Sequence, residues 1–188
     1  KDFQPKDFDD ILGFLEDLST QEHGYKTVCV DTVNWVEPMV WEKVAGKGGD
    51  IEKVGGGFGK GYTAAVGHWR ALISALEGLW STRSMNIILL SHVQIKRFAD
   101  PEGESYDRYE AAMNTKAADA LRQWSDFVLF MRQESFSQVS EKDKKVKGFS
   151  TGKRIIHSNW TAAYDAKSRV RLPDPLALSW EAFASAVE

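Results

Sequence analysis

Two short apolar runs with a helical pattern between them constrain the fold more than any other feature of this chain. Residues Thr27–Val30 and 85–90 are mostly apolar, as in parallel strands that helices cover on both faces. Between them, residues 62–80 carry apolar side chains at helical spacing. This order of strand, helix and strand is typical of a right-handed parallel crossover. The sequence therefore predicts an α/β fold.

The rest of the chain extends this pattern on both sides. Apolar residues at helical spacing predict helices over 8–18 and 115–124. Residues 93–114 show neither period, so we expect a long loop there, and loops of this length are commonly functional. Antiparallel strands are expected toward the C-terminal end. The remaining predicted elements are strands at 127–131, 154–158 and 162–167, a polar hairpin tip at 133–153, and a strand or helix at 178–187.

Length and composition indicate a globular domain of moderate size. The 188 residues, 43% of them hydrophobic, can bury one ordinary core, so we expect residues 1–188 to form a single domain. A formal net charge of -3 disfavours a protein that coats nucleic acid by bulk charge, so any such site is local. The longest aliphatic run, 87–90, is far too short for a bilayer, and no targeting pattern is visible. We expect no membrane partner and a cytoplasmic location.

The single cysteine and the histidines predict neither a disulfide nor a zinc site. Cys29 lies inside the apolar run Thr27–Val30, where we expect a buried, inert thiol. The histidines are scattered, with no second ligand at the spacing of a zinc site. They are His23, His68, His92 and His157.

The glycine-rich segment 55–61 superficially resembles a phosphate-binding loop. That motif requires G-x-x-x-x-G-K followed by Ser or Thr, between a strand and a helix. Here Val54 stands at the first glycine position and Gly61 replaces the hydroxyl residue. We therefore expect a flexible loop that leads into the long helix.

Two polar residues stand where the predicted parallel strands end. Asp31 follows the first strand and resembles a Walker B aspartate, which orders magnesium through water beside the phosphates of a nucleotide. The alternative is a strand-end turn or the cap of a helix that starts at Thr32. His92 follows the second strand and could sense a terminal phosphate, or it could be a structural histidine. Because ligands of open parallel sheets gather at the carboxyl ends of strands, both residues are expected in one crevice.

With these residues in place, the chain resembles the RecA-like ATPases, and specifically the phage-encoded family associated with single-strand annealing. Residues 28–32 look like a Walker B strand, and 87–92 look like the next strand, whose tip carries the phosphate sensor. Residues 116–130 are similar to the helix and strand after the second DNA-binding loop. Lys167 and Arg169 match the Lys-x-Lys motif that reaches the ATP of a neighbouring protomer. Further likeness to the phage type lies in 58–62, 91–109 and 164–167.

The resemblance implies ATP and magnesium as cofactors, within a RecA-like, mostly parallel sheet flanked by helices. By this match Asp31, Thr32, Ser91 and His92 contact the nucleotide, and Asp31 holds magnesium through water. Asp31, His92, Lys167 and Arg169 are then the catalytic set. The resemblance also implies that residues 93–115 contact single-stranded DNA. The expected DNA contacts are Lys96, Arg97, Tyr106, Arg108 and Tyr109.

The basic residues of the predicted loop, the pair Lys167 and Arg169, and a second basic run each have an alternative interpretation. The acidic residues of the loop could leave it merely solvated; they are Asp100, Glu102, Glu104 and Asp107. Lys167 and Arg169 could be a solvated pair on an edge strand. A second basic run could contact DNA or form a solvated hairpin; it comprises Lys142, Lys144, Lys145, Lys147, Lys153 and Arg154.

The family's Walker A loop and the acidic residue that positions the attacking water are expected before Lys1. This chain is therefore expected to be the part from Walker B to the C-terminus, and by itself to hydrolyse ATP negligibly. The implied function is ATP-dependent single-stranded-DNA binding in recombination or annealing, in the host cytoplasm. The implied partners are single-stranded DNA, further copies in a filament or ring, and a single-strand DNA-binding protein. The alternative is a non-enzymatic degenerate RecA-fold module that binds DNA or a replication or recombination partner.

Overall fold

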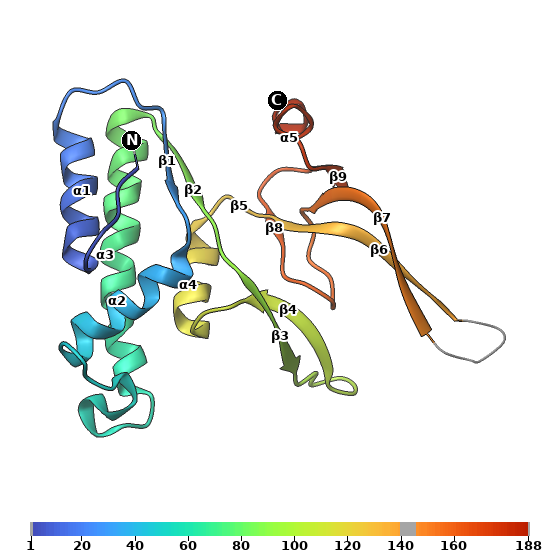
Figure 1. Cartoon of the computed structure of the whole chain (residues 1–188), viewed down its shortest axis with the longest axis horizontal. Coiled ribbons are helices and arrows are strands. Elements are labelled where there is room, and N and C mark those ends of the chain that lie inside the picture. Colours follow the sequence, from blue (N-terminus) through green and yellow to red (C-terminus); the bar gives the residue numbers. More distant parts are fainter. Residues whose placement is uncertain (1, 140–145, 188) are drawn as a thin grey trace. The chain divides into compact units, whose positions relative to one another are not determined.

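The computed structural model describes residues 2–139 and 146–187, and the chain divides into two compact units (Figure 1). The first unit comprises the chain up to Gln94 together with Ala111–Trp124. The second comprises Ile95–Glu110 and the chain from Ser125 onward. Each unit has its own apolar clusters. The expectation of a single domain stays a prediction.

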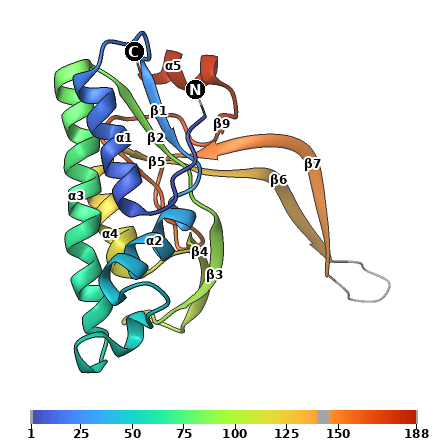
Figure 2. The ribbon, with the colours of Figure 1, turned by 60° about the vertical axis from the view of Figure 1, so that its left-hand side comes forward.

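The first unit is built around a long helix. Its helices are α1 (Phe8–Thr20), α2 (Val33–Ala45), the 3-10 helix η1 (Ile51–Gly56), α3 (Lys60–Arg83) and α4 (Thr115–Trp124). α3 packs against α1, α2 and α4, and Figures 1 and 2 show α1 and α3 side by side. Trp69, Leu72 and Leu76 of α3 are almost fully buried in the apolar cluster of this unit. The predicted helices over 8–18 and 115–124 are therefore confirmed.

Two parallel strands carry the predicted crossover. β1 (Thr27–Val30) pairs with β2 (Asn86–Leu89) in parallel, with Val28 opposite Ile87 and Val30 opposite Leu89. The α/β class is thus confirmed, although this sheet has two strands in the described residues. The expectation that both faces are covered is wrong. Successive strand residues point to opposite faces, and here one face packs on the helices while the other is open.

Cys29 shows the consequence most clearly. Val28 is buried, whereas Cys29 is exposed, so the prediction of a buried thiol is wrong. Ile88 of the adjacent strand is 42% exposed. Partial desolvation and the negative charge of Asp31 raise the pKa of the Cys29 thiol, which keeps it protonated and poorly nucleophilic.

The segment predicted as a structureless loop is largely ordered. Residues 93–114 contain β3 (Val93–Phe98) and β4 (Tyr106–Ala111), which pair with each other as a hairpin (Figure 1). The prediction failed because most of the side chains on both strands are polar or charged, which hides the period of two. Aromatic contact between Phe98 and Tyr106, with ring centroids 5.2 Å apart, joins the two strands near the turn.

The second unit continues from this hairpin region into antiparallel strands, as predicted. β6 (Phe130–Val139) pairs antiparallel with β7 (Val146–His157), which also pairs with β9 (Leu176–Ala177). β5 (Phe127–Val128) pairs with β8 (Lys167–Ser168). These strands confirm the strand predicted at 154–158 and most of the strand predicted at 127–131. The hairpin tip predicted at 133–153 is wrong in extent, because β6 and β7 run through most of it, and its basic residues Lys142, Lys144 and Lys145 lie outside the described residues.

Two further predictions are corrected in this unit. The strand expected at 162–167 is reduced to a bridge between Tyr109 and Tyr164 and the two residues of β8. The element expected at 178–187 is a helix, α5 (Trp180–Val187). His157 anchors the unit's polar core: its Nδ1 lies 2.6 Å from the Asp174 carboxylate, and its ring stacks on Tyr164. Arg132 Nε donates to His157 Nε2 at 3.2 Å, so the two ring nitrogens of His157 contact different partners.

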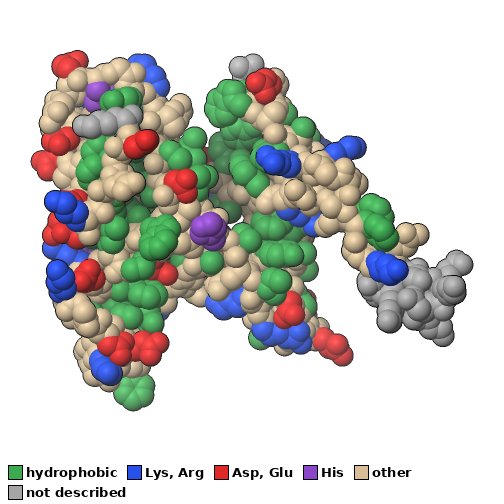
Figure 3. Space-filling model, in the orientation of Figure 1, with side chains coloured by type: hydrophobic (Ala, Val, Ile, Leu, Met, Phe, Trp, Pro, Cys, Tyr) green, Lys and Arg blue, Asp and Glu red, His purple; other side chains and the backbone are tan. Residues whose placement is uncertain are grey.

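Exposed side chains on the surface are of mixed type, and hydrophobic ones are common among them (Figure 3). Phe58 is fully exposed and Trp35 is 71% exposed. Within the described residues, no helix combines the length and apolarity that a bilayer crossing needs.

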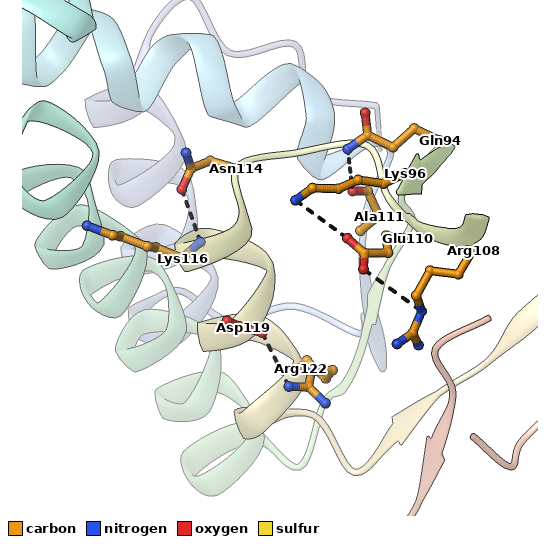
Figure 4. A network of polar contacts seen from close by, with 9 residues as sticks. All are labelled: Gln94, Lys96, Arg108, Glu110, Ala111, Asn114, Lys116, Asp119 and Arg122. Carbon is orange, nitrogen blue, oxygen red and sulfur yellow. Dashed lines mark hydrogen bonds and ion pairs between the residues drawn. The ribbon is translucent and has the colours of Figure 1, made fainter. Parts of the chain in front are cut away.

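A buried carboxylate links α2 to α4 in the first unit. Glu37 is 6% exposed, and its Oε1 accepts a hydrogen bond of 2.8 Å from the backbone N–H of Asn114. Asn114 Oδ1 in turn accepts from the Lys116 N–H in the first turn of α4 (Figure 4). Burial raises the pKa of Glu37, and the hydrogen bond from Asn114 offsets only part of that effect.

We expect the stability of the protein to report on this carboxyl group. Since its pKa in the folded protein is raised, its contribution is present below the unfolded-state pKa and is lost as pH rises through the folded value. In Glu37→Gln, whose amide oxygen can still accept from Asn114, urea-unfolding free energies should lose this pH-dependent fall. Glu37→Ala should cost about 1–3 kcal/mol, because the Asn114 N–H loses its partner. Glu42→Gln, at an exposed position of α2, should retain the fall; identical profiles for wild type and Glu37→Gln would contradict the assignment.

Candidate functional site

The ends of β1 and β2 bring Asp31 and His92 to the same end of one parallel pair. Hydrogen bonding continues past the strands, with Leu90 N–H donating to Val30 O and Val33 N–H donating to Leu90 O, each at 2.9 Å. Asp31 and His92 are both exposed. The prediction that they share one end of the sheet is confirmed; their roles stay predictions.

Asn34, which the sequence analysis does not single out, ties these strand ends together. Its Oδ1 accepts from the His92 backbone N–H and its Nδ2 donates to Ala112 O, both at 2.7 Å. Ala112 N–H donates to His92 O at 2.8 Å, which closes the connection. The first turn of α2 therefore fixes the backbone at His92. An Asn close behind a strand-end Asp was the available signal, but an Asn at a helix start is common.

The start of α2 separates the two interpretations of Asp31. The helix begins at Val33 with Thr32 as its N-cap residue, so Asp31 does not occupy the capping position. Thr32 is 7% exposed, and its Oγ1 is buried without a hydrogen-bond partner in the described chain. The exposed Asp31 carboxylate fits a hydrated magnesium ion, which keeps several of its waters, whereas the Thr32 hydroxyl is buried beside it. Among the described residues, no cluster of three His, Cys, Asp or Glu side chains offers a metal site made by protein groups alone.

Ser91 lies between the end of β2 and His92. It is exposed, and its hydroxyl donates to His92 O at 3.0 Å. The side chain is therefore at the strand end where the resemblance expects it, with no contact that assigns it a role.

The glycine-rich segment does not form a phosphate loop. It follows η1 and leads into α3, which begins at Lys60, rather than joining a strand to a helix. Lys60 Nζ folds back to donate to Gly55 O at 3.1 Å. Gly55, Gly56 and Gly57 have positive φ, as a tight turn requires.

The cations expected to contact DNA lie on the β3–β4 hairpin and face carboxylates. Lys96 Nζ lies 3.7 Å from Glu110 Oε2, and Arg97 Nη1 lies 3.4 Å from Asp107 Oδ1. Arg108 is 6% exposed, and its Nε lies 3.9 Å from Glu110 Oε1. Figure 4 shows Glu110 between Lys96 and Arg108.

The two tyrosines of this set each contact another ring. Tyr106 lies against Phe98, and Tyr109, 38% exposed, lies against Phe130 at 5.3 Å. The hairpin thus combines basic and aromatic side chains, but the three cations have acidic neighbours and the tyrosines have ring partners.

Lys167 and Arg169 both reach the turn that precedes β5. Lys167 Nζ donates to Ser125 O at 2.8 Å, and Arg169 Nη1 lies 2.9 Å from Asp126 Oδ1. The Arg169 N–H also donates to Asp126 O at 3.2 Å. A carbonyl and a carboxylate within the same unit therefore meet this pair of cations.

Comparison with known proteins supplies the family. No curated protein and no solved structure matches the chain. A sequence model of the AAA domain matches residues 1–170, which is most of the chain and includes Asp31, His92, the β3–β4 hairpin and Lys167 with Arg169. AAA domains are nucleotide-binding ATPase domains, for which a nucleotide and magnesium are the expected ligands. The chain belongs to the AAA domain family.

Proposed function

We propose that this protein is a RecA-like, ATP- and magnesium-dependent protein of the phage recombination type that binds single-stranded DNA and promotes annealing or strand pairing. The observation that carries the proposal is the placement of Asp31 and His92 after paired parallel strands in a chain of the AAA domain family. Ligands of open parallel sheets bind at this end of the strands.

The nucleotide role follows from the groups at that edge. Phosphoryl transfer is catalysed mainly by positioning and by neutralising charge on the phosphate oxygens. Asp31 and Thr32 would hold hydrated magnesium, which would neutralise charge on the phosphate oxygens. Ser91 and His92 would contact the terminal phosphate. Asn34 holds the backbone at His92 through a hydrogen bond, which fixes the position from which the His92 side chain extends.

The DNA role is assigned to the β3–β4 hairpin. Lys96, Arg97 and Arg108 would exchange their carboxylate neighbours for phosphates, while Tyr106 and Tyr109 would stack with bases. Such exchange makes binding dependent on salt. Assembly as a filament or ring, with recruitment by a single-strand DNA-binding protein, would place Lys167 and Arg169 at a neighbour's nucleotide.

One set of contacts favours the second candidate, a non-enzymatic module. Lys167 and Arg169 are held by Ser125 and Asp126 of their own unit rather than left to meet a neighbour's phosphate. In that case the fold would bind DNA or a replication or recombination partner without turnover.

Substitution of Asp31 distinguishes the two candidates. In the full-length protein with single-stranded DNA, Asp31→Ala should lower magnesium-dependent ATP hydrolysis at least about 100-fold, because the metal loses its strand-end carboxylate. Phosphate release is the measurement, and Asp119→Ala, on α4, is the matched control. Turnover by Asp31→Ala at the wild-type rate would refute the nucleotide site, and absence of turnover in the wild type would favour the module.

A mixing experiment tests the assignment of Lys167 and Arg169. The double variant Lys167→Ala, Arg169→Ala should still bind ATP but fail to activate its neighbour, since a cation supplied in trans neutralises transition-state charge. Mixing the double variant with Asp31→Ala protomers should restore part of the wild-type ATPase rate. Activity returns at interfaces where Asp31 of the double variant meets Lys167 and Arg169 of the Asp31→Ala protomer. Normal hydrolysis by the double variant in DNA-bound assemblies would make the pair a structural contact to the 125–126 turn.

A further inference from the structure

Arg108 lies in an unusual setting for a charged side chain. Its guanidinium carbon is 5.3 Å from the centre of the Phe98 ring and 5.4 Å from that of Trp160, so aromatic rings flank it. Tyr106 contacts Phe98 in turn, at 5.2 Å between centroids. Four planar groups therefore follow one another in the order Tyr106, Phe98, Arg108 and Trp160. All four belong to the second unit.

Two of the three guanidinium nitrogens of Arg108 lack acceptors. Arg108 Nε and Nη2 are fully buried and have no hydrogen-bond partner within the described chain. The carboxylate of Glu110 is 3.9 Å from Nε, which is beyond hydrogen-bond distance, and its other oxygen faces Lys96 at 3.7 Å. A buried arginine is ordinarily paired with a carboxylate or phosphate through parallel hydrogen bonds, because unsatisfied buried donors are costly. Two donors of the buried guanidinium are therefore left without an acceptor.

Trp160 forms the outer part of this cluster. It is 56% exposed although the Arg108 guanidinium lies over its ring. The segment that carries it is held beside β4, because Tyr109 N–H donates to Ala163 O at 2.8 Å and Tyr109 bridges to Tyr164. An indole ring backed by a fixed cation and open to solvent is a platform on which an unpaired base can stack.

We propose that Trp160 and Arg108 bind one nucleotide unit of single-stranded DNA, with the base stacked on Trp160 and the adjacent phosphate bound by the Arg108 guanidinium. Because Nε and Nη2 are buried, binding of the phosphate requires local rearrangement of the side chains around the guanidinium, while the outer face of Trp160 stays open to the base. Glu110 competes with the phosphate for both Arg108 and Lys96. This inference rests on the proposed binding of single-stranded DNA and adds a residue, Trp160, from outside the hairpin.

The first experiment measures stacking. A fluorescently labelled oligothymidylate is titrated with the full-length protein, and anisotropy gives the Kd. Trp160→Ala should raise Kd at least about tenfold, as loss of one base–aromatic stack does, and Trp160→Phe should stay within about threefold. Trp180→Ala, which removes another exposed tryptophan of the same unit, should leave Kd unchanged. Thermal unfolding followed by circular dichroism shows whether each variant is folded, and Trp160→Phe keeps a ring should the alanine variant unfold.

The second experiment tests a substitution that should strengthen DNA binding. Glu110→Gln removes the competing carboxylate, so it should lower Kd about three- to tenfold and steepen its dependence on salt. Glu104→Gln, in the turn of the same hairpin, makes the same change in net charge and should alter Kd less than twofold. If Glu110 has a purely structural role, Glu110→Gln should either weaken DNA binding or change Kd no more than Glu104→Gln does. Equal effects of the two substitutions would therefore overturn the phosphate contact at Arg108.

The outcomes separate this inference from the proposed function. If the wild type binds oligothymidylate and both Trp160→Ala and Glu110→Gln leave Kd unchanged, the site is wrong and single-strand binding lies elsewhere. If the wild type does not bind single-stranded DNA at all, both the site and the proposed DNA function are refuted. A duplex of the same length should bind at least about tenfold more weakly, because its bases are already stacked; equal weakening of duplex and single strand by Trp160→Ala would reject base stacking.

Discussion

The parallel pairing of β1 with β2 is the contact on which the first unit depends. Parallel neighbours cannot be joined by a tight turn, so the chain must travel the length of the sheet and return. Here α2, η1 and α3 make that return, and α3, with 24 residues, is about 36 Å long. Its buried stripe then gathers α1, α2 and α4 into one apolar cluster. A strand pair this short is stable only because that helical layer covers one of its faces.

The same pairing determines where polar chemistry can occur. Parallel register places the residues that follow both strands at one edge, and the Asn34 side chain then connects that edge to the backbone at 92 and 112. The first unit also buries two polar side chains of α2 and its N-cap. The Thr32 hydroxyl is buried without a partner, and Glu37 is buried as a carboxyl group with a raised pKa. Burial of such groups costs stability unless hydrogen bonds compensate for it.

Sequence periodicity predicted the elements that are apolar and regular, and it missed those whose pattern is masked. The crossover, α1, α3 and α4 follow directly from apolar spacing. A helix in the region of α2 was predicted only as an alternative interpretation of Asp31, and α2 contains Pro38, a residue that ordinarily ends a helix. The β3–β4 hairpin was read as a loop, since ion pairs and rings rather than alternating aliphatic residues hold it. Cys29 was wrongly placed in a core because an apolar run does not reveal whether both faces of a strand are covered. Asp31 and His92 could be placed from sequence; Asn34, Glu37 and Trp160 could not, because their positions depend on contacts between distant segments.

Lys96, Arg97, Lys167 and Arg169 differ from Arg108 in how their charged groups are satisfied, and that difference ranks the five residues as proposed ligand contacts. Lys96 and Arg97 are exposed and face carboxylates, so exchanging those neighbours for phosphates gains little beyond the release of counterions. Lys167 and Arg169 make close contacts to Ser125 and Asp126, which an incoming anion would have to break. Arg108 is desolvated, and its Nε and Nη2 have no hydrogen-bond acceptor. An anion at this position would satisfy these two donors. The proposed site therefore assigns the largest gain on anion binding to Arg108, the cation that surface exposure alone would rank last.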